Sequence, residues 1–130
     1  RWAIDEADPG VDIGRLALTE VSYRISDGVI LDADVVVNAS GEFEWVASEE
    51  GCDNAYDLEG TLAHEFGHLL GLGHSLDIDA TMYASGTECE RVKRDLSPDD
   101  VAKNGSVRFP LRFAIQITLT INHGFPLKDQ

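Results

Sequence analysis

The segment from Leu62 to Ser75, LAHEFGHLLGLGHS, constrains this chain more than any other, because it holds three of its four histidines. His64 and His68 are four residues apart, so on a helix their side chains lie one above the other on the same face. A catalytic zinc site takes three protein ligands, with nitrogens at about 2.0–2.1 Å, and leaves the fourth tetrahedral position to water. The spacing therefore predicts that both histidines bind one zinc ion.

His74 is the predicted third ligand, and it requires the helix to end before it. A helix continued for six residues past His68 would point His74 away from the ion. Gly71 can take the left-handed conformation without the steric cost of a Cβ atom, so we expect the helix to stop there. At its other end, Asp57 is the predicted N-cap. The expected apolar face of the helix consists of Leu58, Leu62, Phe66, Leu69 and Leu70.

Glu65 follows His64 directly and is the predicted general base. Zinc lowers the pKa of a bound water to near 7, so a carboxylate on the open side of the site can take its proton at neutral pH. This chemistry hydrolyses a peptide bond. The alternative, that the histidines are ordinary core or surface residues, is disfavoured because the pattern H-E-x-x-H-x-x-G-x-x-H matches at every fixed position.

With these residues the sequence resembles the metzincin metallopeptidases, and Ser75 after the third histidine is similar to the matrixin branch. The run ATMYA at residues 80–84 resembles the Met-turn of that family. The resemblance implies that Met82 supports the zinc site from below and that Tyr83 lines the S1′ pocket. For Met82 the other interpretation is a core-filling methionine.

The resemblance implies an α+β, metzincin-like fold: a twisted, mostly β sheet with an active-site zinc helix, a Met-turn and a C-terminal helix. Residues 14–25 and 29–38 alternate as two strands around the turn at Asp27-Gly28, with a slip at Thr19–Glu20 that predicts a bulge. By resemblance, residues 14–23 form the sheet edge that pairs with an extended substrate. The other interpretation is an ordinary hairpin.

The chain divides into a matrixin-like core at residues 1–101 and a tail at residues 102–130. The run LSPDD at residues 96–100 resembles the start of the last matrixin helix, with Ser97 as N-cap. Residues 114–121 alternate like a strand, so the tail is either an added strand or a segment unrelated to the family. The first strands and the long helix of a matrixin domain have no counterpart, so we expect a core truncated at its N-terminus.

Three further predictions concern bridges and metals. The chain has two cysteines, Cys52 and Cys89, and an even number of cysteines in a secreted protein favours a disulfide over two free thiols or metal ligation. Asp32 and Asp34 match calcium-binding acids of the family. No histidine precedes His64, so the second, structural zinc of vertebrate matrixins has no counterpart and a bacterial-type matrixin fits better.

Net charge limits the partners. At −14, the chain lacks the basic excess that nucleic acid or an anionic membrane requires. The zinc motif and the family resemblance together imply a secreted, extracellular zinc metalloprotease, a hydrolase that acts as a monomer on protein or peptide substrates such as extracellular matrix. Two alternatives are a zinc-binding but inactive fragment or interaction module, and a calcium-stabilised acidic domain whose histidines are incidental.

Overall fold

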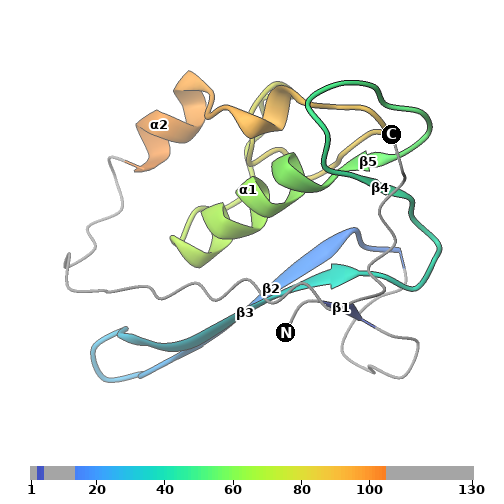
Figure 1. Ribbon diagram of the computed structural model, residues 1–130. Coiled ribbons are helices and arrows are strands. Elements are labelled where there is room, and N and C mark those ends of the chain that lie inside the picture. Colours follow the sequence, from blue (N-terminus) through green and yellow to red (C-terminus); the bar gives the residue numbers. More distant parts are fainter. Residues whose placement is uncertain (1–2, 5–13, 105–130) are drawn as a thin grey trace.

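A small mixed sheet and one central helix organise the computed structural model, which describes residues 3–4 and 14–104 (Figure 1). The sheet has the order β1-β3-β2, with β1 parallel and β2 antiparallel to β3. A short parallel pair, β4-β5, leads into the helix. In chain order the elements are β1 (Ala3–Ile4), β2 (Ala17–Tyr23), β3 (Ile30–Asn38), β4 (Trp45–Val46), β5 (Tyr56–Asp57), α1 (Leu58–Leu69), the 3₁₀ helix η1 (Val92–Arg94) and α2 (Pro98–Asn104).

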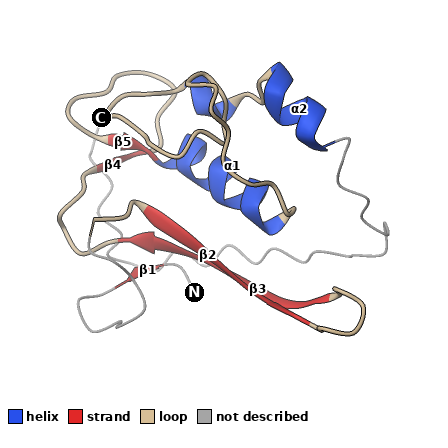
Figure 2. Ribbon diagram, turned by 180° about the vertical axis from the view of Figure 1, so that it is seen from behind, coloured by secondary structure: helices blue, strands red, loops and turns tan. Residues whose placement is uncertain are grey.

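The hairpin of β2 and β3 confirms the two predicted strands, and β2 lies at the edge of the sheet (Figure 2). The predicted bulge at Thr19–Glu20 is wrong, because the pairing is regular from Ala17 to Ser22 and the register shifts only between Ser22 and Tyr23. Thr19 keeps its place in the ladder opposite Val35. The Thr19 side chain points toward α1, where its hydroxyl donates to Glu65, so the strand accommodates this polar residue without a bulge.

The buried core lies between the end of the hairpin, the short β4-β5 pair and the Met-turn. Its fully buried side chains include Val36, Val37, Trp45, Val46 and Met82. Trp45 is the largest of them, and its indole N–H donates to the carbonyl of Asn38 at 2.8 Å. This bond satisfies the one polar atom of the indole, as a buried tryptophan requires.

Both predicted ends of α1 are confirmed. The Asp57 carboxylate accepts the N–H of Gly60 at 2.9 Å, as an N-cap does. At the other end the N–H of Gly71 donates to His68 and that of Leu72 to Gly67, while Gly71 has φ +86°. This is a Schellman motif, and it reverses the chain within a few residues of the second histidine.

The predicted apolar face of α1 is half-buried at four of its five positions, while the buried residues of this helix are Gly60, Glu65 and Gly67. None of the five predicted apolar residues is buried, and Leu70 is 39% exposed. The two glycines explain the difference. A Cβ atom at Gly60 would lie 3.3 Å from the Cβ of Lys93, and one at Gly67 would overlap Met82, so neighbouring segments approach the helix where side chains are smallest.

Helix α2 fixes the Met-turn through one carboxylate. Ser97 caps the helix as predicted, and Asp100, which is 1% exposed, accepts the N–H groups of Ser97, Thr81 and Met82. Burial opposes ionisation, but these three N–H donors hold the pKa of Asp100 below its ordinary value. Asp100 is therefore ionised at neutral pH and binds the turn to the helix.

A disulfide joins Cys52 to Cys89, the pairing favoured from the sequence. It closes a loop of 37 residues, for which the loop-entropy model gives roughly 4 kcal/mol of stabilisation. No helix in the described part is long and apolar enough to cross a bilayer. The strand predicted at residues 114–121 lies outside the described residues.

Candidate metal centre

The three histidines of the zinc motif converge on one point. His64 and His68 project from α1, and the turn after Gly71 brings back His74. The Nε2 atom of His68 lies 3.1 Å from that of His64 and 3.2 Å from that of His74. Two nitrogens bound to one zinc in a tetrahedron are roughly 3.3 Å apart, since each bond is about 2.0–2.1 Å. The triad therefore has the size that a zinc ion needs.

The other ring nitrogens explain why the Nε2 atoms face one another. The Nδ1–H of His64 donates to the carbonyl of Thr81 at 2.7 Å, and the Nδ1–H of His68 donates to the carbonyl of Leu72 at 2.9 Å. A carbonyl only accepts, so the proton of each neutral imidazole is on Nδ1 and the lone pair is on Nε2. Lone pairs that converge without a proton between them fit a cation, and such carbonyl partners are usual behind zinc-binding histidines.

The surroundings of the triad also favour the neutral form of its histidines, which is the form that binds a metal. Burial lowers the pKa of His64 below 6.5 and outweighs the carbonyl of Thr81, which acts in the opposite direction. Desolvation and the neighbouring His68 lower the pKa of His74 as well. Both rings are therefore neutral at pH 7, as metal ligands must be.

These two shifts predict how the metal-free chain responds to acid. Just below pH 6.5 the unfolded chain binds more protons at His64 and His74 than the folded chain does. The free energy of unfolding contributed by these groups is therefore present above that pH and lost as pH falls through the folded-state values. Urea unfolding from about pH 7.5 to about pH 5 measures it. A double variant, His64→Gln with His74→Gln, should show a flatter dependence; equal slopes would contradict the prediction.

Glu65 sits beside the triad, on α1 and 6% exposed. Its carboxylate Oε2 accepts a hydrogen bond from the hydroxyl of Thr19 at 2.6 Å, across from strand β2. The sequence analysis placed Thr19 at a bulge in the substrate-pairing edge and did not connect it with Glu65. The available signal was a hydroxyl in the middle of an edge strand that faces the motif helix.

A cleft of about 730 Å³ opens along the triad. Strand β2 and the residues before it form one wall, α1 forms the second, and the chain after Met82 forms the third. The β2 wall consists of residues 14–19 and Val21, which covers most of the predicted edge at residues 14–23. The helix contributes Thr61, His64, Glu65 and His68, and the third wall contains Tyr83, Ala84, Ser85, Gly86 and Lys93.

Lys93 holds the third wall in place, and sequence reasoning did not identify it. Its ammonium group donates to the carbonyl of Tyr83 at 3.0 Å and to that of Ser85, and lies 5.6 Å from the centre of the Tyr83 ring. Burial lowers the pKa of Lys93, while Glu90 opposes that shift. A cation thus holds the backbone of the third wall at Tyr83 and Ser85.

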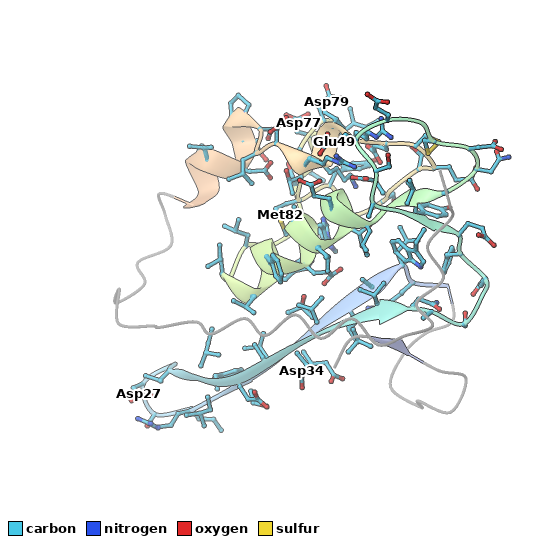
Figure 3. All side chains as sticks on the ribbon, in the orientation of Figure 1. Asp27, Asp34, Glu49, Asp77, Asp79 and Met82 are labelled. Carbon is cyan, nitrogen blue, oxygen red and sulfur yellow. A yellow bond between two sulfur atoms is a disulfide. The ribbon has the colours of Figure 1, made fainter. Side chains whose placement is uncertain are left out.

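Met82 packs against α1 on the side away from the hairpin (Figure 3). It is fully buried, and its carbonyl accepts the N–H of Ser75, the residue after the third histidine. The close approach depends on Gly67, where a Cβ atom would lie 2.1 Å from the Met82 sulfur. Met82 is therefore packed directly against the helix that carries His64 and His68, and its support of a zinc site stays a prediction.

Gly67→Ala should therefore destabilise the chain by about 1–3 kcal/mol or more, because Met82 or the helix must shift. The helix propensity of alanine would by itself act in the opposite direction by about 1 kcal/mol. Thermal unfolding measures the change. Gly73→Ala is the matched control in the same motif, since a Cβ atom there meets nothing within 4 Å. Equal effects of the two substitutions would contradict this account.

The predicted calcium positions stay predictions. Asp34 lies on β3 away from α1 (Figure 3), and Asp32 is exposed on the same strand. In the described part of the chain, the histidine triad is the only group of three or more acidic, histidine or cysteine side chains close enough to share an ion.

Comparison with known proteins extends these observations. A family model described as Matrixin matches residues 2–106. Metalloendoproteinase 1 of Glycine max is 44% identical over 70 residues, which are 54% of this chain and 21% of the relative. Metalloendoproteinase 2-MMP of Arabidopsis thaliana is 45% identical over 71 residues, 55% of this chain and 18% of the relative.

A mammalian relative is also found. Interstitial collagenase of Bos taurus is 54% identical over 46 residues, 35% of this chain and 9% of the relative. The chain thus spans about a fifth, or less, of the length of these curated relatives. No solved structure matches the chain significantly.

Proposed function

This chain belongs to the matrixin family, and on that premise we propose that it is the catalytic core of a zinc-dependent endopeptidase. One observation carries the proposal: three histidine Nε2 atoms converge beside Glu65, at the side of an open cleft. In this proposal His64, His68 and His74 bind the metal. Zinc, when bound there, supplies a Lewis acid that activates water and polarises the peptide carbonyl.

Glu65 is the proposed general base. Its carboxylate holds a water at the open side of the triad, accepts a proton from it on an Oε atom, and later gives that proton to the leaving amine nitrogen. The remaining Nδ1–H bonds of His64 and His68 keep the ligand rings in one orientation through both steps. Met82 supports this arrangement from the far side of α1.

The cleft indicates an extended protein or peptide as substrate. A strand at the edge of a sheet carries unpaired backbone groups, and an extended peptide can add to it as a further strand. Strand β2 is such an edge in the described sheet, and its residues Ala17–Thr19 line the cleft next to the triad. We propose that Tyr83 borders the S1′ pocket, where the third wall meets the cleft.

Several finer features belong to the same proposal. The fold is a metzincin-type domain, in which residues 1–101 form the core and residues 102–130 a separate tail. Asp32 and Asp34 are proposed calcium ligands. We also propose a secreted enzyme that acts as a monomer; the disulfide and the extracellular character typical of matrixins support its secretion.

Zinc dependence tests the proposal. The purified chain should cleave an unfolded protein such as casein, lose this activity when o-phenanthroline removes the zinc, and recover it when zinc is added back. Zinc binding without any cleavage would instead support the inactive, zinc-binding module. Failure to bind zinc at all would overturn the metal site and leave the calcium-stabilised domain.

A further inference from the structure

The hydroxyl of Thr19 lies between two acceptors on one residue of α1. Its Oγ1 atom is 2.6 Å from Oε2 of Glu65 and 2.9 Å from the backbone carbonyl oxygen of the same residue. Among the described residues, this is the one hydrogen bond that the Glu65 side chain receives. Glutamate has three rotatable side-chain bonds, so a carboxylate with a single partner depends on that partner for its direction.

This geometry suits both protonation states of the carboxylate. A hydroxyl has one proton to donate and lone pairs to accept with. When Glu65 is ionised, the Thr19 hydroxyl donates to Oε2. When Glu65 carries a proton on Oε2, that proton can be donated to Oγ1, and the Thr19 hydroxyl turns to donate to the Glu65 carbonyl, which lies within reach.

We propose that Thr19 is the positioning residue of the catalytic glutamate and keeps its carboxylate aimed at the cleft while the proton is gained and released. The proposal rests on the proposed endopeptidase function. The edge strand then has a second task besides contact with the substrate, because one of its side chains orients the general base. A general base displaced by a fraction of an ångström transfers protons much more slowly, so the effect falls on kcat.

Thr19→Val tests this with little change of shape, because valine keeps the branched Cβ that a strand favours and lacks only the hydroxyl. We expect kcat for a fluorogenic peptide to fall about 10- to 100-fold, the range for loss of a hydrogen bond to a charged group. KM should stay within about twofold, since the backbone edge is intact. Thr19→Ser retains the hydroxyl and should recover most of the lost kcat.

Thr87→Val is the matched control. It makes the same chemical change at an exposed position outside the lining of the cleft. It should leave kcat and KM unchanged. A purely structural role for Thr19 would not separate kcat from KM and would not distinguish serine from valine so sharply. If Thr19→Val keeps the kcat of the unmodified chain, or Thr19→Ser is as slow as Thr19→Val, the proposal is overturned.

A second readout needs neither zinc nor cleavage. In the metal-free chain, the urea midpoints of Thr19→Val, Glu65→Ala and the double variant form a cycle that isolates the contact between the two side chains. The shift of the double variant should be smaller than the sum of the two single shifts. Additive shifts would overturn the contact itself. Coupled shifts in a chain that binds zinc and cleaves nothing would keep the contact and reject the endopeptidase function.

Discussion

Glu65→Gln should lower kcat by about 10²- to 10⁴-fold while zinc remains bound, because an amide cannot accept the proton of the attacking water. The substitution keeps the size of the side chain and an oxygen that can still accept from Thr19. The histidine triad and its carbonyl partners are left intact. Peptide cleavage together with zinc content after dialysis measures the two properties separately.

Glu42→Gln is the control for this experiment, since Glu42 is exposed on the loop after β3 and does not line the cleft. Its activity should equal that of the unmodified chain. If Glu65→Gln kept more than about a tenth of the activity, another group would have to be the base. If Glu65→Gln also lost its zinc, the loss of the metal would explain the loss of activity, and the role of Glu65 as the base would not be supported.

Arg94→Met should destabilise the fold by about 3–5 kcal/mol, the cost of leaving a buried carboxylate without its partner. Arg94 donates from Nε and from an Nη atom to the two oxygens of Asp57, at 2.8 and 2.6 Å. The Asp57 side chain is only 2% exposed. That carboxylate also caps α1, so the substitution weakens the start of the helix that carries the metal ligands. Urea unfolding of the metal-free chain measures the change.

Arg91→Met is the matched control, because both arginines belong to the same short segment and reach the same loop. Arg91 donates to the backbone carbonyls of Ser48 and Gly51, and in the described part of the chain it pairs with no carboxylate. Its loss leaves carbonyl groups near water rather than a buried charge, so the expected cost is about 1 kcal/mol. Similar costs for the two substitutions would show that the Asp57 pair is not the source.

The local parts of the fold could be predicted from the sequence because each follows from a few neighbouring residues. The Asp57 cap, the glycine stop at Gly71 and the Ser97 start all depend on side chains or conformations within one turn. The convergence of the three histidines could be predicted for the same reason, because it depends on residues close together in the sequence. Their spacing fixes two ligands on one helix, and the glycine stop returns the third.

Contacts between distant segments could not be predicted in this way. The predicted bulge rested on the slip in the apolar alternation at Thr19–Glu20, but the strand pairs regularly there and the Thr19 side chain finds its partner 46 residues later. The positions of α1 that are fully buried could not be predicted for a similar reason. Burial there is decided by how closely Met82 and Lys93 approach two glycines, and no pattern within the helix reports that distance.

The groups that orient His64 and His68, two of the proposed metal ligands, are two backbone carbonyls, those of Thr81 and Leu72. Every amino acid carries such a carbonyl, so a substitution at either position leaves the acceptor in place as long as the chain follows the same path. The path of the backbone thus sets the orientation of the two imidazoles, and the amino-acid types at these two positions do not reveal it. Relatives with different residues there can share this arrangement, and a search for matching side chains would overlook it.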